Sequence, residues 1–124
     1  MYFLKKKLEI AAAHKLPNYS GKCRELHGHN WFITVHCCCE DSNLDDHQMV
    51  LDFTEIKKIV NELDHSYLND RIENPTAENI AQYLCNKIPA CYMVEVEESK
   101  NNSIYYVKDQ ALFTIARNIG ITKI

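Results

Sequence analysis

Alternating polar and apolar positions open the chain and predict a half-buried strand over residues 2–14. Charged residues occupy positions 5, 7 and 9, which share one face. The opposite face carries Leu4, Leu8, Ile10, Ala12 and His14. A period of two is typical of a β-strand with one buried face, so His14 is expected on the apolar side. Lys6 interrupts that side near the start of the strand.

A second strand is predicted over residues 27–39, after a loop over 15–26 that is marked by Pro17, Asn18, Ser20 and Gly21. Its odd positions form a nearly continuous apolar face with two histidines at its start. They are His27, His29, Trp31, Ile33, Val35, Cys37 and Cys39. A polar turn region follows over residues 40–47.

Helical periodicity replaces alternation in the middle of the chain. Asp52 is a candidate N-cap, with Glu55 placed to complete a capping box. Apolar residues then recur at helical spacing at Phe53, Ile56, Ile59, Val60 and Leu63. Asn74-Pro75-Thr76 opens a second predicted helix, which Pro89 ends.

The last third of the chain predicts a hairpin with strands over 92–98 and 103–108, followed by a short helix over 109–118. The order strand–strand–helix–helix–strand–strand favours an α+β fold. We expect one domain over residues 1–124, with an antiparallel sheet of four strands and two helices on one face.

Composition narrows the possible partners and the compartment. The net charge is −3 and no apolar run approaches the ~20 residues that span a bilayer, so neither a nucleic-acid nor a membrane partner is expected. The N-terminus does not resemble a signal peptide. Six cysteines, three of them consecutive, fit a cytoplasmic protein with reduced thiols, in which residues 37–39 act as small apolar residues. His36 and His47 are expected to face solvent.

His27-Gly28-His29 is the strongest local signal for chemistry. Residues i and i+2 of a strand point the same way, so the two imidazoles share one face. If the two strands pair, His14 converges with them. Three histidines with an open fourth position are typical of catalytic zinc. Two alternatives remain open: hydrogen-bonded core histidines, and a structural zinc site closed by Cys23.

Four further residues suggest acid–base or recognition chemistry. Cys23 lies in the loop before His27, where a nearby dication would stabilise its thiolate. In Asp64-His65 a carboxylate can orient an imidazole. Glu98 ends an apolar strand face, where a carboxylate needs a partner, and strand alternation favours it over Glu97 as the residue that faces the site.

Five segments occur in an order that resembles the 6-pyruvoyltetrahydropterin and 6-carboxytetrahydropterin synthase family. They are residues 11–17, 23–30, 51–53, 63–69 and 73–79. The resemblance covers about residues 8–107. It implies the tunnelling fold (T-fold), in which subunits join their sheets into a barrel. It also implies active sites at subunit interfaces and a hexamer made of two trimers.

The resemblance also implies roles for individual residues. The zinc ligands are His14, His27 and His29, with one Zn²⁺ per subunit. Cys23 matches the proton-abstracting cysteine, and Asp64 with His65 matches the acid–base pair. Glu98 matches the glutamate that anchors the pterin ring, and Thr76 lies in the stretch that lines the pterin pocket. The implied substrate is 7,8-dihydroneopterin triphosphate.

The three residues between Cys23 and His27 resemble the bacterial 6-carboxy-5,6,7,8-tetrahydropterin synthases, lyases of the queuosine pathway. A 6-pyruvoyltetrahydropterin synthase and a non-catalytic zinc-stabilised assembly module are the alternatives. Lys15, Lys22 and Arg24 are candidates for the phosphates. Ser99 replaces the family's usual threonine, and the tail over 109–124 extends beyond the family's usual end.

Overall fold

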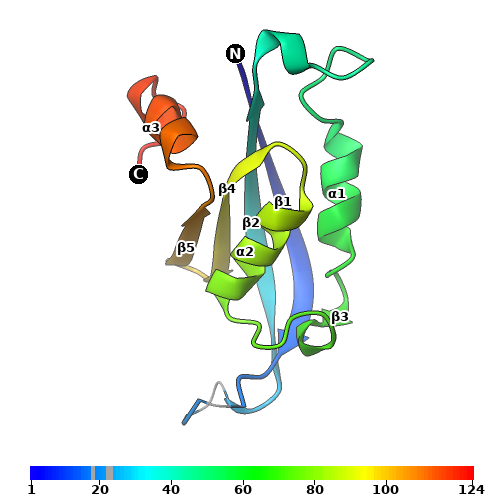
Figure 1. Cartoon of the computed structure of the whole chain (residues 1–124). Coiled ribbons are helices and arrows are strands. Elements are labelled where there is room, and N and C mark those ends of the chain that lie inside the picture. The colour runs from blue at the N-terminus through cyan, green and yellow to red at the C-terminus, as the bar shows by residue number, and fades with distance from the viewer. Residues whose placement is uncertain (18, 22–23) are drawn as a thin grey trace.

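The computed structural model describes residues 1–17, 19–21 and 24–124. It is an α+β fold, in which one five-stranded sheet has the order β3-β1-β2-β4-β5 (Figure 1). The strands are β1 (Tyr2–His14), β2 (His27–Cys39), β3 (Ser66–Tyr67), β4 (Cys91–Ser99) and β5 (Asn102–Val107). The helices are α1 (Phe53–Asn61), α2 (Ala77–Lys87) and α3 (Gln110–Asn118), with short 3₁₀ turns at Asp41–Asn43 and Leu68–Asp70.

The pairing of β1 with β2 organises the sheet. The two strands run antiparallel in an unbroken register from Tyr2 opposite Cys39 to His14 opposite His27. The even positions of β1 therefore share a face with the odd positions of β2, as the sequence predicts. This face forms the larger core, which includes Ile10, Trp31, Ile33, Val35 and Val96.

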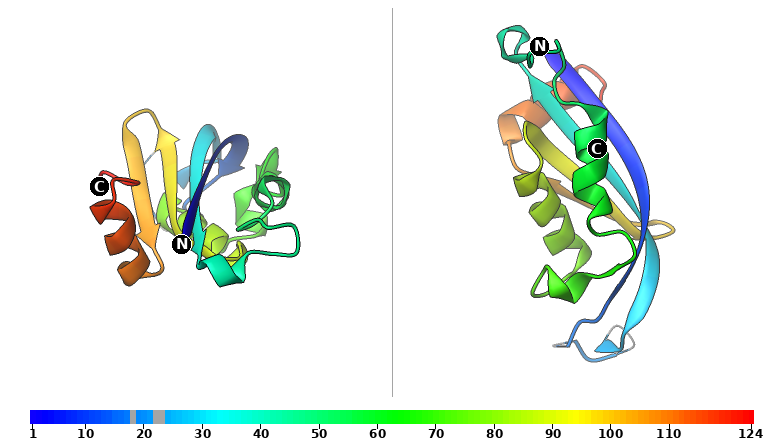
Figure 2. Two further views of the ribbon diagram at one scale, coloured as in Figure 1. Left: turned by 90° about the horizontal axis from the view of Figure 1, so that it is seen from above. Right: turned by 90° about the vertical axis from the view of Figure 1, so that its right-hand side faces the viewer.

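Helices α1 and α2 cover this face of the sheet (Figures 1 and 2). Asp52 caps α1 by accepting a hydrogen bond from the backbone N–H of Thr54, and Thr76 caps α2. Lys6 stands on the covered face, where its ammonium group lies 5.6 Å from the centre of the Phe53 ring. Phe53 was expected to point inward with the other apolar residues of its helix, but it is 55% exposed, since it lies at the first turn of α1 near the margin of the sheet.

The expectation of four antiparallel strands was incomplete. The four predicted strands do form an antiparallel array, but β3 adds a fifth strand parallel to β1, so the sheet is mixed. It pairs Ser66 with Ala12 and Tyr67 with Ala13. A strand of two residues is too short to show an alternating pattern, which explains why periodicity missed it.

The terminal helix α3 is present where the pattern predicts it, but it packs on the sheet face opposite α1 and α2. Ala116 is buried there against Cys38, Tyr92 and Met93, together with Phe3 and Phe113.

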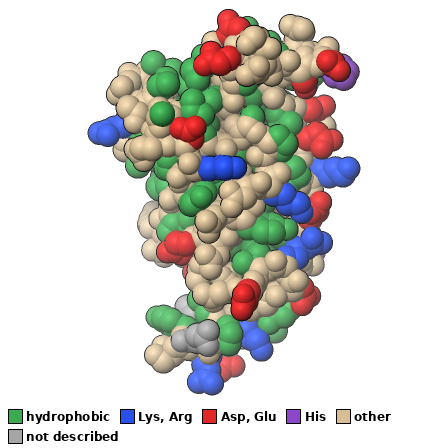
Figure 3. All heavy atoms as spheres, viewed as in Figure 1, with side chains coloured by type: hydrophobic (Ala, Val, Ile, Leu, Met, Phe, Trp, Pro, Cys, Tyr) green, Lys and Arg blue, Asp and Glu red, His purple; other side chains and the backbone are tan. Residues whose placement is uncertain are grey.

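Within the described residues, no helix has the length and apolar character needed to cross a membrane. Figure 3 shows basic and acidic side chains interspersed over one side of the molecule, without a field of a single sign.

His36 is the clearest error of the sequence prediction. It was expected to face solvent but is only 5% exposed. Its face of the sheet is covered near Ile121–Ile124, the end of the tail that the sequence left unexplained.

The cysteine prediction is confirmed for Cys37 and Cys38, which are buried, and the five cysteines in the described chain are free. His47 is exposed as expected.

Burial of His36 generates a prediction about acid stability. Burial, reinforced by the nearby Lys5, lowers the pKa of His36 to about 4 from an unfolded value of 6.5. The unfolded chain therefore binds a proton first, and the free energy of unfolding falls as the pH drops from 6.5 towards 4, by up to about 3 kcal/mol. His36→Phe should flatten this loss in urea titrations at pH 7 and pH 4.5. An equal loss in the variant and the wild type would contradict the prediction.

Candidate metal centre and its surroundings

The strand register brings the three predicted histidines together at one end of the sheet. His14 ends β1 directly opposite His27, and His29 lies opposite Ala12. All three rings emerge on the face covered by the helices. Each ring offers one nitrogen as a possible metal ligand, and these three nitrogens lie within 4.8 Å of one another. The sequence alone left this convergence dependent on strand pairing, and the structure supplies it.

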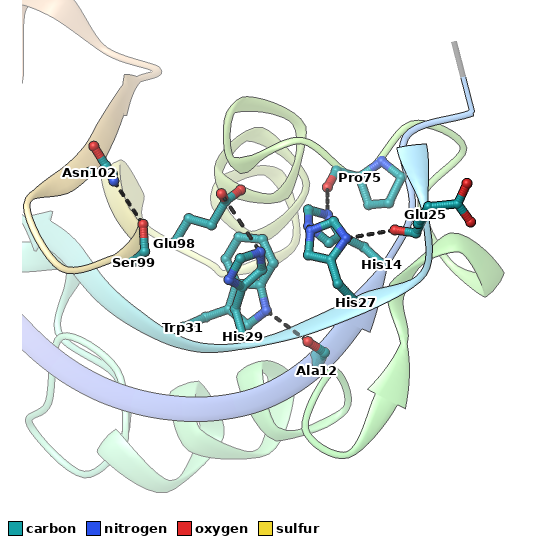
Figure 4. A network of polar contacts seen from close by, with 10 residues as sticks. All are labelled: Ala12, His14, Glu25, His27, His29, Trp31, Pro75, Glu98, Ser99 and Asn102. Atoms are coloured by element: carbon teal, nitrogen blue, oxygen red, sulfur yellow. Dashed lines mark hydrogen bonds and ion pairs between the residues drawn. The ribbon is translucent and has the colours of Figure 1, made fainter. Parts of the chain in front are cut away.

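Backbone carbonyls determine how two of the rings present their nitrogens (Figure 4). The Nδ1 atom of His14 lies 2.8 Å from the Pro75 carbonyl, and the Nδ1 atom of His27 lies 2.7 Å from the Glu25 carbonyl. A carbonyl can only accept, so both Nδ1 atoms carry the proton. In the neutral rings both Nε2 atoms are then left with lone pairs.

Those two Nε2 atoms lie 2.9 Å apart. Two lone pairs at this distance repel each other, and a cation between them would turn the repulsion into attraction. A tetrahedral zinc site with Zn–N bonds of 2.0–2.1 Å places its nitrogens ~3.3 Å apart, which requires only a small adjustment. The donor set therefore fits a metal ion such as zinc.

The environment favours neutral imidazoles, the form that binds metals. His14 is 1% exposed. Burial is the main cause that lowers the pKa of His14, and the Pro75 carbonyl opposes it by raising that pKa. Burial also lowers the pKa of His29, while the negative charge of Glu98 raises it.

Trp31 forms a rigid support beside two of the three histidines. Its side chain is 1% exposed, and its ring centre lies 5.0 Å from that of His14 and 5.1 Å from that of His29, both in edge-on geometry. Its indole N–H donates to the Ala12 carbonyl at 3.1 Å. Because this hydrogen bond fixes the indole, the imidazoles packed against it have little freedom to rotate.

Glu98 approaches the centre from β4. Its Oε1 lies 3.7 Å from Nε2 of His29. Glu97 lies on the opposite face, where it is paired with Ser103. Strand alternation therefore correctly predicted that Glu98, rather than Glu97, faces the histidines. Glu98 also lines a pocket of about 370 Å³ together with the start of α2 and the β4–β5 hairpin, which contribute Ala77, Glu78, Asn101, Asn102, Ser103 and Ile104.

Thr76 lies at the head of α2, immediately before the residues that line this pocket. Its hydroxyl accepts a hydrogen bond from the backbone N–H of Asn79 at 3.1 Å. This bond satisfies one of the free donors at the helix start. The side chain that the family resemblance places at the pterin pocket is thus also the cap of the helix beside it.

Asp64 and His65 form a preorganised pair on the other side of β1. Oδ2 of Asp64 lies 3.0 Å from Nδ1 of His65, and its Oδ1 accepts from the backbone N–H of Ala11 at 2.8 Å. That backbone hydrogen bond is the main cause that lowers the pKa of Asp64. His65 has a positive φ of 55° and an 83% exposed side chain. In the described chain, no hydrogen bond or ion pair links it to the three histidines.

The remaining predicted residues divide into two groups. Cys23 and Lys22 lie outside the described residues. Lys15 and Arg24 are exposed, and the backbone of Lys15 is held by two hydrogen bonds to the Asn69 amide. The contributions of Pro75, Glu25 and Trp31 were not foreseen. Backbone carbonyls leave no mark in a sequence, and the tryptophan appeared only as another apolar position.

Comparison with known proteins identifies the scaffold. Residues 3–109 match the family model described as 6-pyruvoyl tetrahydropterin synthase. The chain is 35% identical to the 6-carboxy-5,6,7,8-tetrahydropterin synthase of Synechocystis, over 86% of this chain and 93% of that protein. The Bacillus subtilis protein of the same name is 31% identical, with 83% of both chains covered.

Solved structures agree with the sequence comparison. The 6-pyruvoyl tetrahydropterin synthase of Caenorhabditis elegans superposes with a TM-score of 0.67 at 26% identity, over 87% of this chain and 96% of the other. The family match, the two relatives and this fold likeness together show that the chain belongs to the 6-pyruvoyl tetrahydropterin synthase family.

Proposed function

We propose that the protein is a zinc-dependent lyase that converts 7,8-dihydroneopterin triphosphate to 6-carboxy-5,6,7,8-tetrahydropterin, with loss of triphosphate and acetaldehyde, for queuosine biosynthesis. The observation that carries the proposal is the convergence of three histidines beside a carboxylate and a pocket, in a chain whose relatives include proteins named 6-carboxy-5,6,7,8-tetrahydropterin synthase.

His14, His27 and His29 would hold one zinc ion per subunit. When bound, the ion supplies Lewis acidity, which lowers the pKa of substrate hydroxyls and polarises a developing carbonyl. The carbonyls of Pro75 and Glu25 keep the rings of His14 and His27 in the tautomer that such binding needs. Trp31 restricts the rotation of the His14 and His29 rings.

Glu98 would anchor the pterin ring. A carboxylate can accept two parallel hydrogen bonds from a ring N–H and the neighbouring amino group, which fixes the orientation of the ring before the reaction. Its 3.7 Å approach to His29 supports a pterin ring anchored close to the histidines. The adjoining pocket of about 370 Å³ falls in the range of small-molecule sites. Thr76, at the head of α2, would contribute to the pocket wall.

Proton transfer would be divided between two groups. The Cys23 thiolate would remove a proton from the substrate side chain. His65, held by Asp64, would exchange protons on the opposite side. The exposure of His65 and its lack of a hydrogen bond or ion pair to the described histidines support a role at the site of a neighbouring subunit.

Such sharing requires a homo-oligomer, and the sheet offers edges for one. In the described chain, β3 covers only Ala12 and Ala13 of β1, so the edge of β1 over residues 2–10 has no partner strand, and β5 forms the other edge. Unpaired edges readily accept another strand. An apolar groove of about 410 Å³ flanks the β1 edge and includes the exposed Tyr2, Met49 and Phe53. We infer a T-fold barrel with a hexamer of two trimers.

Removal of a ligand histidine tests the metal site. His27→Ala should weaken zinc binding by more than about 100-fold, since loss of a ligand costs more than loss of an outer-shell partner. Metal content after dialysis, measured by atomic emission, gives the comparison with wild type. His47→Ala changes an exposed histidine outside the three-histidine cluster, so this variant should retain one zinc per subunit. Equal zinc content in the two variants would contradict the assignment.

Product analysis tests the reaction. Metal-replete protein incubated with 7,8-dihydroneopterin triphosphate should release triphosphate and acetaldehyde in equal amounts. A pyruvoyl product without acetaldehyde would instead identify a 6-pyruvoyltetrahydropterin synthase, the activity named for the Caenorhabditis elegans structure.

Cys23→Ala separates catalysis from a structural role of the cysteine. Loss of the proton-abstracting group should lower turnover by about 10²–10⁴-fold while zinc content and folding are retained. Loss of both zinc and folded structure would favour the zinc-stabilised assembly module. Circular dichroism and atomic emission on the same preparation distinguish the two outcomes.

A further inference from the structure

The turn before α2 determines the direction of the Pro75 carbonyl, which contacts His14. The Asn74 carbonyl accepts from the backbone N–H of Thr76 at 2.8 Å, a hydrogen bond from residue i+2 to residue i that closes a three-residue turn around Pro75. The proline ring fixes φ of the central residue. The hydrogen bond across the turn restrains its ψ, so both backbone angles that aim the Pro75 carbonyl are constrained.

Asn79 holds this turn from the first turn of the helix. Its side-chain amide donates to the Asn74 carbonyl at 2.8 Å, so that carbonyl accepts from both Thr76 and Asn79. The backbone N–H of Asn79 in turn donates to the Thr76 hydroxyl. One residue therefore ties the carbonyl before Pro75 to the helix cap after it.

We propose that Asn79 is a positioning residue for the histidine centre. Through the Asn74–Thr76 turn it aims the Pro75 carbonyl at Nδ1 of His14, and so keeps the proton on Nδ1 and the lone pair on Nε2. The proposal rests on the proposed function, since it takes the three histidines as metal ligands. It gives the Asn74–Asn79 segment a part in metal binding besides the capping of α2.

The consequence is a measurable dependence of zinc affinity on a side chain that touches none of the ligands. Without the amide donor, the Asn74–Pro75 peptide loses one of its two hydrogen bonds, and the Pro75 carbonyl and the His14 ring can reorient. Loss of an outer-shell partner typically weakens metal binding by 10–100-fold. Because Asn79 acts on His14 through the turn, Asn79→Ala should show a loss at the lower end of this range, about 10-fold.

Two further variants separate positioning from helix stability. Asn79→Asp removes the donor but places a carboxylate in the first turn of α2, where the helix dipole favours negative charge. It should weaken zinc binding while leaving the metal-free protein as stable as wild type. Asn86→Ala, the matched control, changes an exposed asparagine of the same helix and should keep zinc affinity within about 2-fold of wild type.

The experiment measures the zinc dissociation constant of the whole protein by competition with a chromophoric chelator, and urea unfolding of the metal-free variants. Wild-type affinity in Asn79→Ala, or affinity losses that follow unfolding free energy across the variants, would overturn the assignment of Asn79 while leaving the proposed function intact. A wild-type protein that binds no zinc would overturn the proposed function, and this assignment with it.

Discussion

The antiparallel register of β1 and β2 is the constraint on which the rest of the structure depends. It places His14 opposite His27 and His29 opposite Ala12, and it places the apolar side chains of both strands under α1 and α2. Because the side chains of a strand alternate, a slip of one residue would move a whole set to the other face. The burial of Ile10, Trp31 and Ile33 therefore also enforces the positions of the three histidine rings, and core stability and site geometry share one cause.

The charge balance of the site follows from this arrangement. At the proposed metal site, three histidines would donate lone pairs without cancelling the charge of a divalent ion, which would remain a strong electrophile towards a substrate oxygen. Glu98 is the nearby carboxylate, yet it approaches His29 from the pocket side. In the proposed function, the Glu98 carboxylate would accept from the N–H groups of the pterin ring, while the ion would act on the side chain of the same molecule.

Much of the fold and part of the site could be predicted from the sequence, since both depend on local periodicity. Alternation located β1, β2 and the hairpin, and it distinguished Glu98 from Glu97. Alternation could not predict contacts between residues that are distant in sequence. The carbonyl of Pro75 is 61 residues from His14, and nothing in a side-chain pattern marks a backbone acceptor. His36 was misjudged for the same reason, because the cover over its face comes from the far end of the chain.

The packing of α3 divides the interior into two cores on opposite faces of one sheet. The family match ends at residue 109, so the smaller core of Cys38, Tyr92, Met93 and Ala116 is completed by a helix outside it. A terminal helix held by so small a core can detach in a local opening that costs less free energy than global unfolding. Burial raises the pKa of Cys38 and keeps its thiol unreactive while α3 is docked. Thiol labelling of Cys38 therefore reports the opening of α3, independently of events at the histidines on the other face.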